Sequence, residues 1–237
     1  MNGKTMNTII AVDKDADVHM RETAEWANYG IEAFRIDTMA EAINLLSHSG
    51  NYLFVVINED TIPDFMLKLR LLRDVTSLPI FVITSNYTIE KKLKAMDYGA
   101  DAYDHFDAYI KKDVIGELES LKEQAKWAKR PAKPPVLTGG DIILSPLRRC
   151  VLIKDNLAPL TRKEFDVLQC LMSGNGHVVT HPKLIRKVWG DKHSLKNTDI
   201  LWRTVDRLRR KIAELSPTEE YIEIERGVGY RFSLPLK

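Results

Sequence analysis

Three arginines recur at helical spacing near the carboxyl end of the chain. Residues 197–215 have the sequence NTDILWRTVDRLRRKIAEL, and at about 100° per residue Arg203, Arg207 and Arg210 share one side of a predicted helix. The opposite side is apolar and would face a core: Leu201, Val205, Leu208 and Ile212. A guanidinium fork donates two parallel hydrogen bonds to phosphate oxygens or to a guanine edge. The pattern predicts contact with nucleic acid, and a merely solvated basic face is the competing interpretation.

The elements predicted before this helix would hold it in place. Thr161 and Glu164 have the spacing of a capping box at the start of one helix, and a second helix begins near Thr180 and ends at Trp189 and Gly190. Three short apolar runs separated by turn formers predict a small antiparallel sheet: residues 142–144, 150–153 and 157–160.

A glycine-rich turn follows the arginine-bearing helix. Residues 221–225 and 229–232 flank Gly-Val-Gly, which predicts a β-hairpin. Three helices followed by a hairpin predict a winged helix-turn-helix. In that arrangement the third helix enters the major groove of DNA, and Arg231 of the hairpin reaches the minor groove.

Charge divides the chain into two halves. Residues 1–127 carry 14 Lys and Arg against 21 Asp and Glu, a net charge of −7, whereas residues 128–237 carry 21 against 12, a net charge of +9. Such asymmetry is expected when one domain contacts nucleic acid and the other does not. The stretch KWAKRPAKPPVL between the halves contains three prolines, which favour extended backbone. We predict a regulatory domain at 1–126, a linker at 127–137 and a winged-helix domain at 138–237.

Five short apolar runs in the acidic half alternate with helical patterns. Runs such as VVI and PIFVI predict strands buried on both faces, and hence a parallel sheet covered by helices. We predict an α/β, flavodoxin-like domain with a doubly wound five-stranded parallel sheet and function at the carboxyl ends of its strands. The predicted strands lie at 8–12, 32–36, 53–57, 80–84 and 102–104, with helices near 18–29, 39–47, 65–74, 89–98 and 111–127.

The acidic half resembles the receiver domain of bacterial response regulators over about residues 7–126, through TIIAVDKD, VVINEDTIP, PIFVITS and GADAY. The resemblance implies two acidic residues after the first strand and an Asp after the third that hold Mg²⁺, this Asp also accepting phosphate. It further implies a Thr or Ser after the fourth strand and a Lys after the fifth that contact the phosphoryl group. Mg²⁺ takes hard oxygen ligands, and a phosphoryl group needs compensating cations.

The chain departs from this pattern around the expected metal. Asp13 matches the first acidic position, but Lys14 occupies the second. Glu59 lies where the phosphoacceptor is expected, with Asn58 as a one-residue alternative and Asp60 as a less favoured one. We hypothesise that the ammonium group of Lys14 pairs with Asp13 or Glu59 in place of a metal.

Thr84 and the aromatic Tyr103 match their positions in the resemblance, whereas Phe106 replaces the expected lysine. We therefore predict a receiver that holds no metal or cofactor and acts without phosphorylation. The alternative is a conventional phosphorylated response regulator that uses a carboxylate near Glu59 or Asp60.

Mixed charge on the fourth and last predicted helices of the acidic half suits a self-complementary two-fold surface. The resemblance implies dimerisation through this region, and solvated charges are the competing interpretation. The predicted homodimer residues are Lys91, Lys94, Asp97, Asp101, Lys111 and Glu117.

The basic half closely resembles the effector domain of OmpR/PhoB-type transcription regulators over about residues 138–234, through LTRKEFDVLQCL, VVTHPKLIRKVWG, RLRRKI and RGVGYRF. Asp199 and Asp206 stand where that family often has Arg, so DNA preference is expected to differ. We favour Arg203 for base readout, and Trp189 has helix-end packing as an equal interpretation. The predicted DNA-binding residues are Arg203, Thr204, Arg207, Arg209, Arg210, Arg231 and Trp189.

These patterns predict a cytoplasmic, sequence-specific transcription regulator that binds double-stranded promoter repeats as a homodimer, with RNA polymerase as a further partner. An enzyme is the competing class, but the sequence contains no phosphate-binding glycine loop, no nucleophile elbow and no metal-spaced histidines. A redox regulator acting through Cys150 is a third hypothesis.

Overall fold

The computed structural model describes residues 7–15, 23–24, 26–28, 30–48, 52–106, 136–190 and 198–234. The chain forms two compact units, residues 1–133 and 134–237. Their boundary falls within the predicted linker, most of which lies outside the described residues, as does the helix predicted at 111–127. No helix in the described part of the chain is long and apolar enough to span a bilayer.

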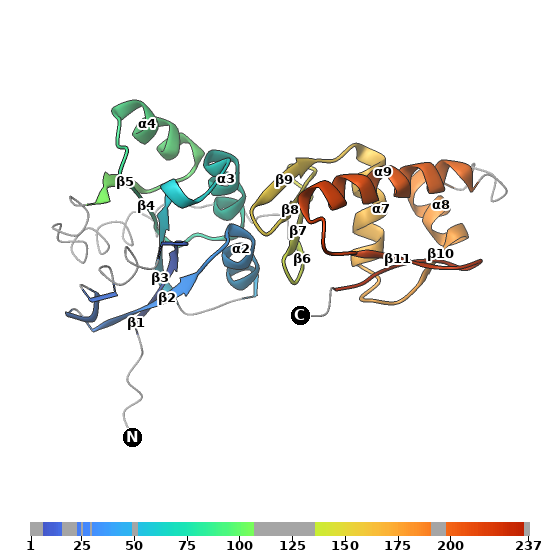
Figure 1. The fold of residues 1–237 in the computed structure, drawn as a ribbon, viewed down its shortest axis with the longest axis horizontal. Coiled ribbons are helices and arrows are strands. Elements are labelled where there is room, and N and C mark those ends of the chain that lie inside the picture. The colour runs from blue at the N-terminus through green and yellow to red at the C-terminus, as the bar shows by residue number, and fades with distance from the viewer. Residues whose placement is uncertain are drawn as a thin grey trace, which may run out of the picture. The chain divides into compact units, whose positions relative to one another are not determined.

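The first unit contains the predicted five-stranded parallel sheet, in the order β2-β1-β3-β4-β5 (Figure 1). Because all neighbouring pairs are parallel, the carboxyl ends of the strands share one edge, and the chain order reverses between β1 and β3. Polar side chains at this switch point are therefore brought together. The strands are β1 (Asn7–Val12), β2 (Ile31–Ile36), β3 (Tyr52–Asn58), β4 (Ile80–Thr84) and β5 (Ala102–His105).

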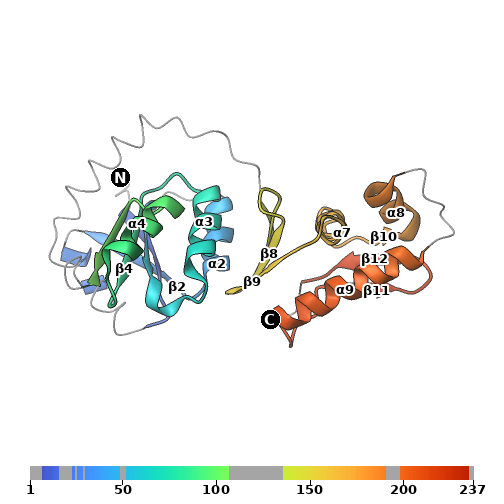
Figure 2. The same cartoon turned by 90° about the horizontal axis from the view of Figure 1, so that it is seen from above.

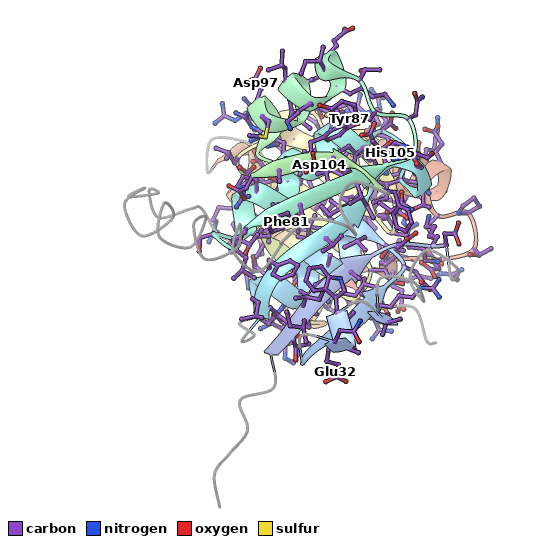
Figure 3. All side chains as sticks on the ribbon, turned by 90° about the vertical axis from the view of Figure 1, so that its left-hand side faces the viewer. Glu32, Phe81, Tyr87, Asp97, Asp104 and His105 are labelled. Carbon is purple, nitrogen blue, oxygen red and sulfur yellow. The ribbon has the colours of Figure 1, made fainter. Side chains whose placement is uncertain are left out.

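Helices cover the sheet because its central strands are apolar on both faces. Helix α2 (Met39–Ser47) packs against α3 (Phe65–Val75), and α3 packs against α4 (Ile89–Tyr98), as Figure 2 shows from above. A separate apolar cluster includes Phe81 of β4, which Figure 3 labels. In this cluster the ring of Phe54 lies 5.1 Å from those of Trp26 and Phe81.

A four-stranded antiparallel sheet opens the second unit. It comprises β6 (Leu137–Gly139), β7 (Ile142–Ser145), β8 (Cys150–Ile153) and β9 (Asn156–Pro159). The sequence does not predict strand β6, and the first residue of this strand, Leu137, falls at the end of the predicted linker. Three residues beside a Gly-Gly pair carry too little periodicity to reveal a strand before its partner is known.

Three helices and a hairpin complete the second unit: α7 (Arg162–Met172), α8 (His181–Trp189), α9 (Asp199–Leu215), β11 (Ile222–Glu225) and β12 (Gly229–Phe232). The predicted capping box is confirmed, since Thr161 caps α7 and the Glu164 carboxylate accepts from the Thr161 amide at 2.9 Å. Strand β10 (Val179–Thr180) was not predicted, because two residues form a strand here only by pairing with β12.

Candidate nucleic-acid interface and receiver pocket

Helix α9 has the two faces that its sequence predicts. Leu201, Val205, Leu208 and Ile212 lie at 0–3% exposure in the core of the second unit. The side chains of Arg203, Arg207 and Arg210 are exposed. A basic strip on a helix anchored by its apolar face is the geometry required to enter a groove of DNA.

Two exposed arginines of the predicted interface are held by carboxylates. Arg210 forms an ion pair with Asp206 one turn earlier, and the Arg231 Nε donates to Glu223 Oε2 at 2.8 Å across the hairpin. Arg203, by contrast, has no acidic partner among the residues that the structure describes, and Arg207 has none there either. These two side chains therefore present the least neutralised charge of the strip.

Two of the predicted DNA-binding residues lie in packing positions. Thr204 is 1% exposed and its hydroxyl donates to the Ile200 carbonyl at 2.8 Å, which removes it from the exposed face. Trp189 packs against the core, with the Lys163 Nζ 5.6 Å from its ring centre, in agreement with the helix-end interpretation.

Arg209 joins α9 to the hairpin. Its guanidinium donates to the Ile222 carbonyl, lies 3.3 Å from Glu220 Oε1 and sits 5.9 Å from the Tyr230 ring centre. A planar cation suits this combination of carbonyl, carboxylate and aromatic face. The main role of Arg209 in this arrangement is to fix the hairpin against the helix.

Trp202 is a surface residue that the sequence prediction missed. It is 50% exposed on α9, directly before Arg203 and one turn before Asp206. Its position on the polar side of the helical wheel was the available signal, since an apolar ring there has no core to enter. An exposed ring on this face offers apolar contact to a thymine methyl group.

The hairpin, which is the wing of the predicted fold, is held by β10 next to its turn. Thr180 pairs with Gly229, and a Cβ atom added at Gly229 would lie 2.1 Å from the Val179 carbonyl oxygen. The turn is formed at Gly227, whose φ of +74° favours glycine. Glycine at position 229 is therefore required by the close approach of a neighbouring backbone.

At the carboxyl edge of the first sheet, Asn58 and Asp13 form a buried pair. The Asn58 Nδ2 donates to both Asp13 carboxylate oxygens, at 3.2 and 3.1 Å. Burial raises the pKa of Asp13, although hydrogen bonds from Asp15 and Asn58 oppose this effect. Strand β3 ends at Asn58, so the residue beside Asp13 at the strand ends is an amide, and Glu59 lies beyond the strand.

Asp60 lies in the 3-10 turn η1 (Glu59–Thr61) and reaches the end of β4. Its carboxylate accepts from Thr84 Oγ1 and from the Ser85 amide at 2.6 Å each, and from Ser85 Oγ at 2.7 Å. Burial raises the pKa of Asp60, but these hydrogen bonds outweigh burial and leave the pKa lowered. The sequence ranks Asp60 below Glu59 and Asn58 as the residue at the phosphoacceptor position, whereas in the structure it is Asp60 that contacts Thr84 and Ser85.

Glu59 connects η1 to β5 and α4. Its carboxylate accepts from the Tyr103 hydroxyl at 2.5 Å and lies 3.5 Å from Lys91 Nζ. Tyr103 is fully buried, and burial together with Glu59 raises its pKa. The Tyr87 ring lies 5.8 Å from that of Tyr103, near the end of β5 that Figure 3 marks by His105.

Two residues predicted for the pocket lie at its margin. Phe106 packs against the apolar cluster that contains Phe54, so its ring contributes to the core. Lys14 is exposed. The partners described above for Asp13 and Glu59 are other side chains, and the pairing of Lys14 with either remains a prediction.

The predicted dimer residues divide into three groups. Lys91 contacts Glu59, and Asp101 pairs with Arg73 while accepting from the Ile80 amide at 2.8 Å, so both have roles within the unit. Lys94 and Asp97 are exposed on α4. Lys111 and Glu117 lie outside the described residues.

Helix α4 also exposes apolar side chains that the charge-based prediction omitted. Ile89, Leu93 and Met96 are 66%, 62% and 42% exposed. Their spacing of four and three residues places them on one face. An apolar strip of this kind on a surface helix is typical of an interaction site.

Both cysteines of the chain are buried in the second unit, Cys150 in β8 and Cys170 in α7. Burial raises the pKa of Cys170, which disfavours the reactive thiolate. The enclosure of Cys150 at 6% exposure gives the redox hypothesis no structural support.

Comparison with known proteins agrees with these features. Residues 155–232 match the family model described as "Transcriptional regulatory protein, C terminal". The sensory transduction protein RegX3 of Mycolicibacterium smegmatis is 30% identical over 161 residues, covering 68% of this chain and 70% of that protein. The KDP operon transcriptional regulatory protein KdpE of Escherichia coli is 26% identical over 232 residues, which cover 96% of this chain and 99% of KdpE.

Among solved structures, the Thermotoga maritima response regulator DrrB, an OmpR/PhoB homologue, has 23% identity and a TM-score of 0.38. The match covers 96% of this chain and 99% of the DrrB chain. On the basis of the RegX3 relationship, the matched effector model and the two folds described above, this chain belongs to the OmpR/PhoB family of response-regulator transcription factors, which bind DNA.

Proposed function

We propose that this chain is a sequence-specific transcription regulator whose receiver acts without phosphorylation and which binds promoter repeats as a homodimer, together with RNA polymerase. The observation that carries the receiver part is the Asn58–Asp13 pair at the switch point of the sheet. The observation that carries the DNA part is the exposed pair Arg203 and Arg207 on a core-anchored helix.

On DNA, Arg203 reads a base edge and Arg207 contacts phosphate. Arg210 and Arg231 are exposed ion-paired residues, and a phosphate group can replace their carboxylate partners at little cost, because exposed pairs are weak. Trp189 and Arg209 support the interface indirectly, because Trp189 packs against the core and Arg209 holds the hairpin against α9. A dimer of such domains suits half-sites about one helical turn apart.

In the receiver, the residues present fit Mg²⁺ poorly. Lys14 stands at the second acidic position, and Asn58 directs its amide nitrogen, which is no metal ligand, toward Asp13. Asp60, the nearest alternative phosphoacceptor, already accepts three hydrogen bonds. These contacts favour a pocket that is satisfied without metal or phosphate.

Incubation of the full chain with acetyl phosphate and Mg²⁺ is expected to give no stoichiometric phosphorylation, as measured by intact-mass spectrometry. Affinity for duplex DNA, measured by fluorescence anisotropy, should be unchanged by the same treatment. Asp60→Asn is the matched variant. If the natural chain becomes phosphorylated and the Asp60→Asn variant does not, the conventional phosphorylated alternative is established.

The homodimer is proposed to form through α4. Its exposed Leu93 and the charges of Lys94 and Asp97 provide an apolar centre with a polar rim. Sedimentation equilibrium is expected to show a dimer that Leu93→Glu converts to monomer. The exposed edge-strand variant Phe34→Glu on β2 controls for the loss of apolar surface, and equal dissociation by both variants would contradict the assignment to α4.

A further inference from the structure

A tight turn between α7 and β10 carries an exposed Asn-Gly pair. Asn175 and Gly176 are the central residues of this turn, in which the His177 amide donates to the Gly174 carbonyl at 3.0 Å. Their φ angles are +49° and +81°, a conformation that asparagine and glycine adopt more readily than other residues. The turn therefore explains why these two residue types stand here, and it leaves both exposed to water.

The two groups of this pair that can react with each other are not held by other hydrogen bonds. Neither the Asn175 carboxamide nor the Gly176 amide has a hydrogen-bond partner among the residues that the structure describes. A Cβ atom added at Gly176 would meet nothing within 4 Å, so no side chain shields the backbone nitrogen. The exposed Asn156 differs, because its carboxamide donates to the Leu215 carbonyl at 2.8 Å and Leu157 follows it.

We propose that Asn175 is a site of spontaneous deamidation, which makes the second unit more negative as the molecule ages. The Gly176 backbone nitrogen attacks the side-chain carbonyl carbon of Asn175 and forms a carbon–nitrogen bond. The bond from that carbon to the side-chain nitrogen breaks, and ammonia leaves with the proton that Gly176 gives up. Water then opens the five-membered imide at either carbonyl, giving aspartate or isoaspartate. The first step is intramolecular, between neighbouring residues of an open turn, which favours it.

Either product places a carboxylate beside the wing. Asn175 lines a groove of about 520 Å³ together with Arg231 of β12 and Thr138 of β6. Arg231 already pairs with Glu223, so a second carboxylate in the groove would compete with a DNA phosphate for the same guanidinium group. This consequence rests on the proposed function, in which Arg231 contacts DNA, whereas the chemical step does not.

Isoaspartate has a further effect, because it adds one carbon atom to the main chain between α7 and β10. The turn has little room for this atom, since a Cβ atom at Gly174 would already lie 3.0 Å from the Leu171 carbonyl oxygen. Strand β10 begins at Val179, which pairs with Tyr230 of the wing. The longer connection should therefore loosen the pairing of β10 with β12 and lower the melting temperature.

The test is to incubate the full chain at mildly alkaline pH, which helps to remove the backbone proton, and to follow each asparagine by peptide mapping with mass spectrometry. Conversion at Asn175 should be about tenfold faster than at Asn156 or more, since Asn156 must first lose a hydrogen bond and is followed by a bulky residue. The Asn2-Gly3 pair, outside the described residues, reports whether the conditions are reactive. Conversion at Asn175 no faster than at Asn156 would overturn the proposal.

Matched variants separate the modification from its effect on DNA binding. Asn175→Gln keeps the amide but needs a larger ring, so it should stay unconverted and keep the natural affinity for DNA. Asn175→Asp should weaken DNA binding about two- to fivefold at low salt, as expected for an exposed charge pair. Thr218→Asp adds the same charge at an exposed position outside the groove and should not weaken binding.

The two readouts fail separately. Equal weakening by Asn175→Asp and Thr218→Asp would overturn the effect that is assigned to the groove. Natural affinity in Asn175→Asp would contradict the DNA contact of Arg231 in the proposed function, and the mapped deamidation would stand. Absence of faster conversion at Asn175 would overturn the modification site and leave the proposed function intact.

Discussion

Arg203→Ala together with Arg207→Ala is expected to weaken binding to the chain's target duplex by roughly 2–5 kcal/mol, since single groove or phosphate contacts contribute about 1–3 kcal/mol each. Both side chains are exposed on α9, with no acidic partner in the described part of the chain. The measurement is fluorescence anisotropy at several salt concentrations. The slope of affinity against salt should decrease by about one for each phosphate contact removed.

The single variants assign the roles. Arg203→Ala should relax selectivity at one base position, whereas Arg207→Ala should weaken all duplexes alike. Arg210→Ala is the comparison for a cation already paired with Asp206, and its effect should be smaller. Trp202→Ala should lower affinity without changing the salt slope, because it removes only apolar contact. Natural affinity in the double arginine variant would contradict the assignment of this face to DNA.

Gly229→Ala is expected to destabilise the second unit by about 3 kcal/mol, at the upper end of the 1–3 kcal/mol typical of overpacking. The added methyl group would lie 2.1 Å from the Val179 carbonyl oxygen and 2.8 Å from the Thr180 Cα atom, and backbone atoms cannot turn aside as a flexible side chain does. Separation of β10 from β12 would release the wing and weaken DNA binding as well. Urea denaturation of the full chain measures the loss.

Gly227→Ala is the matched control in the same hairpin. A Cβ atom there meets nothing within 4 Å, so its cost arises only from a φ of +74° and should be about 1 kcal/mol. A Gly229→Ala variant as stable as Gly227→Ala would show that the backbone approach between β10 and β12 is looser than described here.

Local sequence patterns predicted the elements that carry the proposed DNA interface. The four apolar positions of α9 recur at 3.6-residue spacing, so they identified both the buried face and the arginine face before any partner was known. The Thr161–Glu164 capping box is likewise a contact within four residues, and the structure confirms it. The apolar runs predicted the sheet because strands buried on both faces need no partner-specific information to be recognised.

Positions whose environment depends on distant segments were predicted less well. Thr204 follows Arg203 in sequence, but one further step of 100° turns it into the core. Asn58, Glu59 and Asp60 are the three candidates for the phosphoacceptor position. Which of them lies at the end of β3 depends on where that strand stops, and the end of the strand is fixed by its pairing with β1 and β4.

The sequence by itself determined the two-domain plan, the parallel sheet and the amphipathic arginine helix, because each follows from periodicity and composition within a short window. Only the tertiary structure decided that Asp60 engages Thr84 and Ser85, that Asn58 faces Asp13, and that Trp202 remains at the surface. The physical reason is that these contacts join residues 24 to 45 positions apart, or depend on the absence of a covering element. Chain folding creates such proximities, and no local pattern encodes them.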